Sequence, residues 1–583
     1  MFLKGLSIKN FRCIRDLTLY INEGVNIFIG ENNSGKTAVI DALRICFSYG
    51  KQWRDIYVSE SDFHIDKTNP SAGLGDIEFD LYFEIQDRVE AGIFNDLLSE
   101  KKDGKQELEL HFRYYIDEKK GIRRVRYKVW GGEKEGQSIT PDLLDLFYFV
   151  HLGALRDAVQ YLRPVRGNRL GELYSNIETD EKKKESLAGK VRKALGDDKE
   201  WSTLIDQGRE KINEHLNETS INGKEQNVTI DFLPFEFRRI VDSLRIQMPV
   251  YDNEAIKDGD DQRYFDLRQN GLGYNNLIYT ATVLGDLKRK KELIEETYIA
   301  LLIEEPEAHL HPQLQDIFFN YLNKLNKIGF QIFISSHSPT ITAKADLNSL
   351  IVLQNQENKI QSFSIKRSDL NESNKKYLQK FLDVTKSQLL FANGVILVEG
   401  ISEALLIPVF SKIIGDEYNI EKKGIELVNL NGVAFEHFGK LFNADDPNSR
   451  LNCRCVILTD DDRHNGGEVS SRAKKAKDLE KNLLKVELAE QTFEYELFTA
   501  GNNREILLQI FSEMHPIAAE RIDTGDSIED HAKNFIEKIV SNKAKSELAH
   551  RLAIKLNDES DVRENFTVPS YIKTGIKWVV KGE

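Results

Sequence analysis

The chain contains one segment in which three acidic residues follow an apolar run directly. Residues 455–464 read CVILTDDDRH. Adjacent carboxylates repel one another unless a cation lies between them, so a metal ion is one explanation of the pattern. A solvated turn is the other explanation, because aspartate is common in the turns that follow strands. On this segment alone the turn is favoured, and other acidic positions must decide.

A second apolar strand with an acidic end lies upstream. Residues 394–410, GVILVEGISEALLIPVF, predict a strand ending in Glu399 and a helix carrying Glu403, and residues 424–432, GIELVNLNG, predict another strand. In a parallel α/β sheet the carboxyl ends of the strands share one edge, so Glu399, Asp460 and Asp462 are expected to converge. Carboxylate oxygens favour Mg²⁺ or Mn²⁺ over zinc. Two such ions about 4 Å apart activate water and stabilise the leaving oxygen of a phosphodiester.

A phosphate-binding loop is predicted near the start of the chain. Residues 30–37, GENNSGKT, fit the pattern G-x-x-x-x-G-K-[ST] between a predicted strand and a predicted helix. Backbone N–H groups would surround a phosphate, Lys36 would supply charge to the β and γ phosphates, and Thr37 would ligate magnesium. The predicted nucleotide-binding residues of this loop are Gly30, Asn33, Ser34, Gly35, Lys36 and Thr37.

Two later strands carry the residues expected opposite such a loop. Residues 298–312, YIALLIEEPEAHLHP, place Glu304 to hold magnesium through water and Glu305 to orient the attacking water. Residues 330–339, FQIFISSHSP, end a strand in His337, whose imidazole could sense the γ phosphate. The alternative is structural, a core strand followed by a solvated turn and a histidine with no role in catalysis.

Composition limits the classes of protein that remain. The chain has 583 residues, a net charge of -14, 40% hydrophobic residues and four cysteines. This length predicts two or three domains. No apolar run is long enough for a membrane span and the start lacks a signal-peptide pattern, so a cytoplasmic protein is expected. The acidic total means that any nucleic acid must be contacted through local basic patches or metals. Residues 471–485 are a candidate for such a patch, and the alternative is a solvated helix. The basic residues of this segment are Arg472, Lys474, Lys475, Lys477 and Lys481.

The order of phosphate loop, paired glutamates and strand-terminal histidine resembles the ABC-type ATPase heads of the RecF and SMC group. The opening IKNFR, residues 8–12, adds to this resemblance, which covers residues 1 to about 360. It implies a signature segment that caps ATP across a dimer. The matching segment is LRQNGLGYNNLIY, residues 267–279, in which Asn270 and Gly271 would present backbone amides at a helix start. The segment departs from the serine-containing signature of that group.

The C-terminal order E-G, N-x-N-G, D-x-D resembles the Toprim domain shared by topoisomerases, DnaG-type primases and certain nucleases. An ATPase head followed by Toprim resembles the OLD (overcoming lysogenization defect) family, which includes the nuclease of the Gabija antiviral system and retron-associated nucleases. This resemblance implies roles for Glu494, in residues 492–497, as a further metal ligand and for Lys545, in residues 543–552, in neutralising the transition state. It also implies that residues 566–580 form the last strand and helix.

Together these observations predict an α/β protein with an ABC-type ATPase head and a C-terminal Toprim domain. The predicted divisions are an N-terminal ATPase part (1–165), a helical insertion that is a candidate for dimerisation (166–245), a C-terminal ATPase part (246–370) and Toprim (390–583). The predicted metal ligands are Glu399, Glu403, Asp460, Asp462 and Glu494 in the nuclease site and Thr37 and Glu304 in the ATP site; the predicted catalytic residues are Glu399, Asp460, Asp462, Lys545 and Glu305.

The predicted function is an ATP-regulated, divalent-metal-dependent DNA endonuclease used against phage. Its expected partners are DNA, a second copy of the chain or a higher homo-oligomer, and a helicase or a retron reverse transcriptase with its RNA. One alternative, a non-cutting RecF/SMC-like repair ATPase, leaves the carboxylates unexplained. A topoisomerase would need a nucleophilic tyrosine in a companion domain, and a primase would need a template-binding partner domain. The ATPase head supplies neither.

Overall fold

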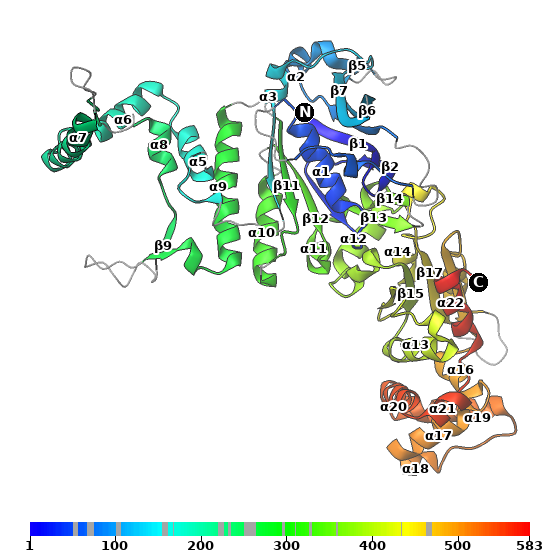
Figure 1. Ribbon diagram of the computed structural model, residues 1–583. Helices are drawn as coiled ribbons and strands as arrows, with labels where there is room; N and C mark the ends of the chain where they lie inside the picture. The colour runs from blue at the N-terminus through cyan, green and yellow to red at the C-terminus, as the bar shows by residue number, and fades with distance from the viewer. Residues whose placement is uncertain are drawn as a thin grey trace. The chain divides into compact units, whose positions relative to one another are not determined.

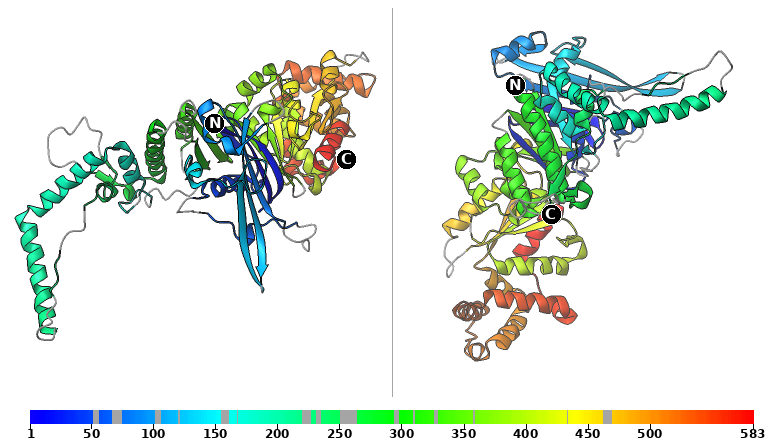
Figure 2. Two further views of the ribbon diagram at one scale, coloured as in Figure 1. Left: turned by 90° about the horizontal axis from the view of Figure 1, so that it is seen from above. Right: turned by 90° about the vertical axis from the view of Figure 1, so that its left-hand side faces the viewer.

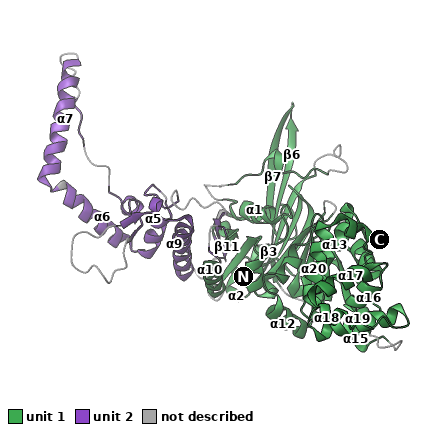
Figure 3. Ribbon diagram, turned by 90° about the horizontal axis from the view of Figure 1, so that it is seen from below, with its two compact units in different colours: residues 1–145, 302–307, 312–583 green, residues 146–301, 308–311 purple. Residues whose placement is uncertain are grey.

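The computed structural model describes the chain except for residues 51–55, 67–74, 101–105, 120, 154–160, 167, 220–226, 231–234, 250–263, 294–297, 309–310, 326–328, 357–358, 433 and 462–468. Figures 1 and 2 show the helices and strands along the chain. The chain divides into two compact units (Figure 3). Unit 1 comprises residues 1–145, 302–307 and 312–583, and unit 2 comprises residues 146–301 and 308–311. Among the helices described, none is long and apolar enough to cross a membrane.

Unit 1 begins with an antiparallel sheet whose strand order is β2-β1-β4-β6-β5, with β7 paired to β6. Hydrophobic side chains alternate along its central strand, where Ile77, Phe79, Leu81 and Phe83 are fully buried. This period of two places one face of the sheet against the core. The strands are β1 (Phe2–Phe11), β2 (Ile14–Tyr20), β4 (Ile77–Glu84), β5 (Leu98–Glu100), β6 (Gln106–Lys119) and β7 (Ile122–Gly131). Two short helices, α2 (Arg88–Ile93) and α3 (Pro141–Asp145), accompany them.

The second sheet of unit 1 is parallel and carries the phosphate loop. Strands β13 (Leu350–Gln356), β3 (Val25–Ile29) and β12 (Phe330–Ser336) lie side by side, and β14 (Lys359–Ser364) pairs antiparallel with β13. Every residue of β3 and β12 is buried, as expected for parallel strands covered on both faces. Helices α1 (Lys36–Phe47), α10 (Pro312–Leu325) and α11 (Pro339–Lys344) follow β3, β11 (Tyr298–Glu304) and β12 in the chain.

The C-terminal sheet has four parallel strands in the order β16-β15-β17-β18. These are β16 (Ile425–Asn429), β15 (Gly394–Val398), β17 (Arg454–Asp460) and β18 (Leu484–Ala489). The accompanying helices are α13 (Ile401–Ile414), α14 (Phe435–Gly439), α15 (Ser471–Lys477), α16 (Phe493–Thr499), α17 (Asn503–Met514), α18 (Pro516–Ala519), α19 (Ile528–Ser541), α20 (Lys545–Asp558), α21 (Ser560–Asn565) and α22 (Ser570–Lys581). The parallel order means that the ends of β15 and β17 lie at one edge, as predicted.

The strand expected at the start of residues 566–580 is not formed. Residues 566–569 are irregular, and only the following helix, α22, agrees with the expectation. The buried side chain of Asn503 accepts a hydrogen bond from Thr567 N at 2.8 Å and donates one to Thr567 O at 2.7 Å. These bonds satisfy the backbone groups that a strand would have offered to a sheet.

Within unit 1, side-chain hydrogen bonds join the ATPase sheet to the C-terminal sheet. Gln354, in β13, accepts from the backbone N–H of Asn452, just before β17, at 2.8 Å. The Ser387 hydroxyl donates to the carbonyl of Pro339 in α11 at 3.0 Å. The polar stretch at residues 366–376 is partly helical, because α12 (Glu372–Phe381) begins inside it. The connection is therefore ordered and packed.

Unit 2 is mostly helical. Helix α5 (Arg169–Ile177) packs against α8 (Phe237–Asp242) and α9 (Leu272–Leu293), and the carbonyl of Asn176 accepts from Arg289 Nε at 3.2 Å. Helices α6 (Glu181–Gly196) and α7 (Lys199–Thr219) extend the unit, and α7 has no buried residue. The strands of this unit are β8 (Phe147–Leu152), β9 (Gln247–Pro249) and β10 (Tyr264–Asp266), together with residues 298–301 of β11.

Candidate nucleotide and metal sites

At two positions of the phosphate loop, the backbone conformation requires glycine. Gly30 has φ +146, and a Cβ there would lie 2.1 Å from the carbonyl oxygen of Leu353. Gly35 has φ +94, and a Cβ there would lie 2.9 Å from Ile360 Cδ1. Asn33 also has a positive φ of 65, which asparagine tolerates better than most residues. The loop thus turns tightly between β3 and α1, as its sequence predicts.

Lys36 is buried at the start of α1 and its ammonium group lies inside the loop. It donates to Gly30 O at 2.8 Å, Glu31 O at 2.6 Å and Ser34 Oγ at 3.2 Å. Burial lowers the pKa of Lys36 to about 8, against the raising effect of carboxylates including Glu305 and Glu307. These contacts hold the charge where the phosphates of a nucleotide would enter. Thr37, the next residue, is exposed.

The paired glutamates and the histidine meet beside the lysine. Glu305, with φ +43, donates its backbone N–H to Ser335 O at 2.8 Å, and its carboxylate lies 3.6 Å from His337 Nε2. Glu304 is the last residue of β11 and is partly buried. Burial and the charge of Lys36 lower the pKa of His337, so its imidazole is neutral near pH 7. The structure therefore brings Glu305, His337 and Lys36 together.

Glu307 takes part in this site although the sequence pattern did not single it out. Its Oε1 accepts from Ser336 Oγ and from the backbone N–H of His337, both at 2.8 Å. Burial raises the pKa of Glu307. Its carboxylate fixes the end of β12 and hence the position of His337. The sequence EEPE, residues 304–307, did show Glu307 as a third glutamate. Its contacts with β12, however, depend on the turn at Glu305.

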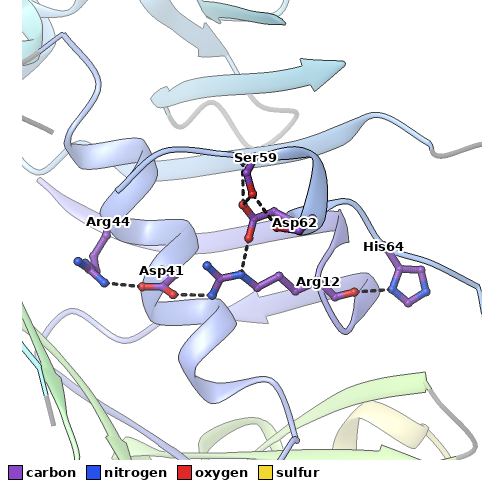
Figure 4. A network of polar contacts seen from close by, with 7 residues as sticks. Arg12, Asp41, Arg44, Ser59, Asp62 and His64 are labelled. Carbon is purple, nitrogen blue, oxygen red and sulfur yellow. Dashed lines mark hydrogen bonds and ion pairs between the residues drawn. The ribbon is translucent and has the colours of Figure 1, made fainter. Parts of the chain in front are cut away.

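Arg12, the last residue of IKNFR, fastens the first sheet to the helix of the phosphate loop (Figure 4). Its guanidinium contacts Asp41 of α1 at 2.5 Å and Asp62 at 2.8 Å. Asp41 also pairs with Arg44 at 2.6 Å, and His64 Nδ1 bonds the carbonyl of Arg12 at 2.7 Å. The motif thus has a structural function, since it positions α1 and with it Lys36.

The proposed signature residues lie in unit 2. Asn270 follows a short 3-10 turn and Gly271 immediately precedes α9, so their backbone amides are at a helix start as expected. Asn275 donates to Leu267 O at 2.6 Å and secures the turn. A Cβ on Gly271 would meet nothing within 4 Å.

In the C-terminal sheet, Glu399 follows β15 and is held by several donors. Its Oε1 accepts from the Thr459 hydroxyl, from Asp460 N at 3.3 Å and from Arg472 Nη2 at 2.7 Å. Its carbonyl accepts from Gly432 N, of the N-x-N-G segment, at 3.0 Å. Among the described residues, none donates to Oε2 of Glu399. One carboxylate oxygen is therefore fixed and the other is available.

Three more predicted residues surround this position. Lys545, the first residue of α20, lies 3.0 Å from the buried carboxylate of Glu494 in α16. Burial, together with the charges of Glu494 and Glu399 and against that of Lys545, raises the pKa of Glu403 to about 7. The carboxylates are thus close enough to repel one another. A bound cation would relieve that repulsion.

Asp460 ends β17, one strand from Glu399, and its backbone N–H contacts the Glu399 carboxylate. Asp462 lies outside the described residues. Asp461, between them, is fully buried and accepts from Ser470 N at 3.3 Å, so it faces away from solvent. No three histidine, cysteine or acidic side chains within the described part are arranged as a complete metal-binding group. The hard oxygen donors nevertheless fit Mg²⁺ or Mn²⁺.

The basic segment 471–485 divides among three roles. Arg472 of α15 pairs with Glu399, a contact the sequence did not predict. Lys477 donates to Val486 O at 2.9 Å and pairs with Glu480, while Lys481 pairs with Asp445 at 2.7 Å. Lys474 and Lys475 are exposed on α15. The segment is not one continuous basic face.

Family models match both the N-terminal and the C-terminal part of the chain. The family model for the AAA ATPase domain matches residues 1–121 and 156–342, and that for the overcoming lysogenization defect protein-like TOPRIM domain matches residues 390–462. Endonuclease GajA of Bacillus cereus is 26% identical over 79% of this chain and 75% of its own length. The Old nuclease of Escherichia phage P2 is 25% identical over 78% of each chain. A solved SMC head bound to the ScpA C-terminal winged-helix domain is 16% identical, with a TM-score of 0.38, over 63% of this chain and 99% of that one.

Proposed function

The chain belongs to the OLD (overcoming lysogenization defect) family of nucleases, with an ATPase domain before an OLD-like Toprim domain, and we propose that it is an ATP-regulated, divalent-metal-dependent DNA endonuclease. The observation that carries this proposal is the crowding of Glu399, Glu403 and Glu494 beside Lys545 at the edge of a parallel sheet. Such an excess of carboxylates suits a site that binds cations and acts on a phosphodiester.

The carboxylates would hold the metal. Glu399 is oriented through one oxygen, leaving Oε2 as a ligand, and Glu403, Asp460, Asp462 and Glu494 supply the other oxygens. Bound Mg²⁺ or Mn²⁺ supplies an activated water and stabilises the leaving oxygen. The protein's own part is to hold and orient the ligands, and a bound cation would favour the ionised form of Glu403, which the protein alone disfavours.

Lys545 would contact the DNA phosphate. The Lys545 side chain is 44% exposed, and its ammonium group lies 3.0 Å from the Glu494 carboxylate. The ammonium group is therefore both held in place and accessible to a phosphate. A positive charge there stabilises the additional negative charge of the pentavalent transition state. Glu494 therefore has two functions, as an oxygen donor and as the residue that positions Lys545.

ATP would bind at the phosphate loop, with Lys36 and Thr37 at the phosphates. Glu304 would hold magnesium, Glu305 would orient the attacking water and His337 would contact the γ phosphate.

Regulation is supported by a short connection inside unit 1. Glu31 of the loop lines the same small cavity as Cys453 and Gln354, and Gln354 of β13 accepts a hydrogen bond from the backbone N–H of Asn452, next to Cys453 and just before β17. Asp460 lies at the other end of the same strand.

The other enzyme classes fit less well. A topoisomerase needs a tyrosine nucleophile. Tyr571 is close enough to the site carboxylates for their charges to raise its pKa. It is buried, and burial together with Asp460 and Glu403 raises its pKa well above 10, so it is a poor nucleophile. A non-cutting repair ATPase would retain Lys36 and Glu305 but gains nothing from the second acidic site.

The assembly and the biological role are part of the same proposal. A homodimer or higher homo-oligomer would bring the segment at Asn270 and Gly271 to the nucleotide of a second copy. Use against phage, in the cytoplasm and with a helicase or a retron reverse transcriptase and its RNA as partners, follows from the family resemblance.

The proposal is tested with supercoiled plasmid DNA. The purified wild-type protein should nick or cut it with Mg²⁺ or Mn²⁺ and stop in EDTA, and Glu399→Gln should be inactive with an unchanged melting profile. The matched control is Glu417→Gln, an exposed carboxylate after α13. Cleavage by Glu399→Gln at the wild-type rate would contradict the proposed function.

A further inference from the structure

A long hairpin formed by β6 and β7 carries a local surplus of positive charge in an acidic chain. Residues 117–128 read DEKKGIRRVRYK, with six cationic and two acidic side chains, while the whole chain has a net charge of -14. In β7, residues 122–124 and 126–128 are exposed. The hairpin extends away from the rest of unit 1 (Figures 2 and 3). We call residues 113–119 and 122–128 the basic ribbon.

The register of the two strands places Arg113, Arg124, Arg126 and Lys128 on one face. Arg124 lies opposite Asp117, Arg126 opposite Tyr115 and Lys128 opposite Arg113. Residues that lie opposite each other in an antiparallel pair share a face, so these form one surface with Trp130 at its base. On the opposite face, the ring of Tyr127 packs against that of Tyr49, with 5.7 Å between their centroids, and half of the Tyr127 side chain remains exposed. The face that carries Arg124, Arg126 and Lys128 is therefore basic and partly aromatic.

The charges on this face lower the stability of the hairpin. Lys128 and Arg113 are like charges in directly opposite positions, which destabilises a hairpin. Each is compensated by a carboxylate, Glu135 at 2.6 Å and Glu78 at 3.0 Å. Lys128 and Glu135 are about half exposed, and pairs of that kind contribute little free energy, so phosphate oxygens can replace the carboxylate.

The outer part of the ribbon is less compensated. Arg126 is 53% exposed and lies 3.8 Å from Asp117, a carboxylate that it shares with Lys119. Arg124 is exposed, and its side chain forms no ion pair or hydrogen bond with any residue that the structure describes. Two arginines with available N–H groups thus stand on the same face, two residues apart.

We propose that the basic ribbon is a docking surface for duplex DNA, an inference that rests on the proposed nuclease function and gives the DNA a second contact remote from the carboxylates. Seven paired residues span about 23 Å, along which duplex DNA presents about seven phosphates per strand. A two-stranded ribbon fits the major groove, and arginine binds phosphate in a bidentate manner.

The free edge of the hairpin adds to this fit. Among the described strands, β7 pairs with β6 alone, so the backbone N–H groups along its outer edge can donate to phosphate oxygens. In a chain with an acidic total, a local basic surface of this kind is what nucleic-acid binding requires. An acidic protein segment would also match the positive charge. It lacks the regularly spaced phosphates that the arginines along the strand would contact.

The test is binding of a short fluorescent duplex in EDTA, where no cleavage occurs, by the full chain over a series of salt concentrations. The variant Arg124→Ala/Arg126→Ala/Lys128→Ala removes the exposed face, and Lys182→Ala/Lys190→Ala/Lys193→Ala removes three exposed cations of α6 as a control. The ribbon variant should bind about tenfold more weakly at low salt, with its salt dependence reduced by about 0.9 per lost phosphate contact. The control should bind as the wild type does.

Further measurements separate the causes. Arg124→Lys/Arg126→Lys should retain most of the salt dependence, because the charge remains. ATP binding and Mn²⁺ binding of the ribbon variant should equal those of the wild type, which shows that it is folded. Equal binding by the ribbon and control variants, an unchanged salt slope, or tighter ribbon-dependent binding of single-stranded than of duplex DNA would overturn the inference.

The two proposals fail separately. If the wild type cuts plasmid DNA but the ribbon variant binds duplex normally, the docking surface is wrong and the nuclease stands. If the ribbon governs duplex binding but no metal supports cutting by the wild type, the nuclease is wrong and the docking surface stands.

Discussion

The guanidinium of Arg472 lies 2.7 Å from Oε1 of Glu399, joining helix α15 to the carboxylate that follows β15. A positive charge therefore occupies one side of the proposed metal site. The Arg472 side chain is 37% exposed and that of Glu399 is 18% exposed, so the pair is partly screened by water. The pair both orients Glu399 and opposes the approach of a cation.

The first prediction is that Arg472→Gln binds Mn²⁺ more tightly than the wild type. Removing a positive charge near a divalent ion contributes at least about 1 kcal/mol even in water, or roughly fivefold in Kd. Calorimetric titration of Mn²⁺ measures this, with Lys477→Gln, on the same helix and paired with Glu480, as the control. Weaker binding by Arg472→Gln would mean that orientation of Glu399 matters more than charge.

The second prediction concerns pH and Glu403. Burial, with Glu494 and Glu399, raises its pKa to about 7, whereas an unfolded glutamate titrates near 4.5. The ionised form is disfavoured in the fold, so stability falls as pH rises from the lower to the higher value. In EDTA at pH 8, Glu403→Gln should therefore be more stable, by up to roughly 3 kcal/mol, and this advantage should vanish near pH 4.5.

Thermal melting across that pH range, with and without Mn²⁺, provides the measurement. Saturating Mn²⁺ should reverse the order, because the wild type then gains a ligand that glutamine replaces poorly. Glu417→Gln should show no such pH dependence. A Glu403→Gln advantage that is equal at pH 5 and pH 8 would contradict the account.

The third prediction separates the nucleotide site from the cutting site. Lys36→Ala should lose ATP binding, because its ammonium group contacts Gly30 O, Glu31 O and Ser34 Oγ in the loop. Glu305→Gln should bind ATP and hydrolyse it slowly, since an amide is a weaker base. Both should retain metal-dependent cutting under at least one nucleotide condition. If neither cuts under any condition, the head is required for catalysis itself.

The sequence predicts more of the proposed ATP site than of the proposed metal site, for a physical reason. Gly30, Gly35 and Lys36 are local in the chain, and their spacing dictates the turn and the helix that follows. Glu307 was missed because its partners, Ser336 and His337, lie on another strand, and only the turn at Glu305 directs it there. Pairings of that kind depend on tertiary structure.

The metal site shows the same limit. The parallel order of β15 and β17 follows from two apolar strands with acidic ends, so Glu399 and Asp460 were expected together and lie together. The Arg472 contact depends on how α15 packs, which helix periodicity does not reveal. The basic ribbon was hidden by the acidic total, although KKGIRRVRYK, with a glycine turn before alternating cations, was a usable signal.

The fourth prediction is that ATP changes DNA binding through a second copy of the chain. Gly271→Asp places an anion at the start of α9, where a Cβ meets nothing within 4 Å, so the fold should be unaffected. In the wild type, ATP or a non-hydrolysable analogue should change DNA affinity by about 5 to 150-fold, the usual range of such coupling. Gly271→Asp should lose this response. Identical DNA binding in every nucleotide state of the wild type would refute the coupling.

The most direct test of the account measures Mn²⁺ binding and plasmid cleavage in the same preparations of wild type, Glu399→Gln, Asp460→Asn and Glu417→Gln. The carboxylate edge of the C-terminal sheet predicts that wild type and Glu417→Gln bind Mn²⁺ and cut, and that Glu399→Gln and Asp460→Asn lose both while ATP binding persists. Wild-type Mn²⁺ affinity together with wild-type cutting in Glu399→Gln and Asp460→Asn would contradict the central claim.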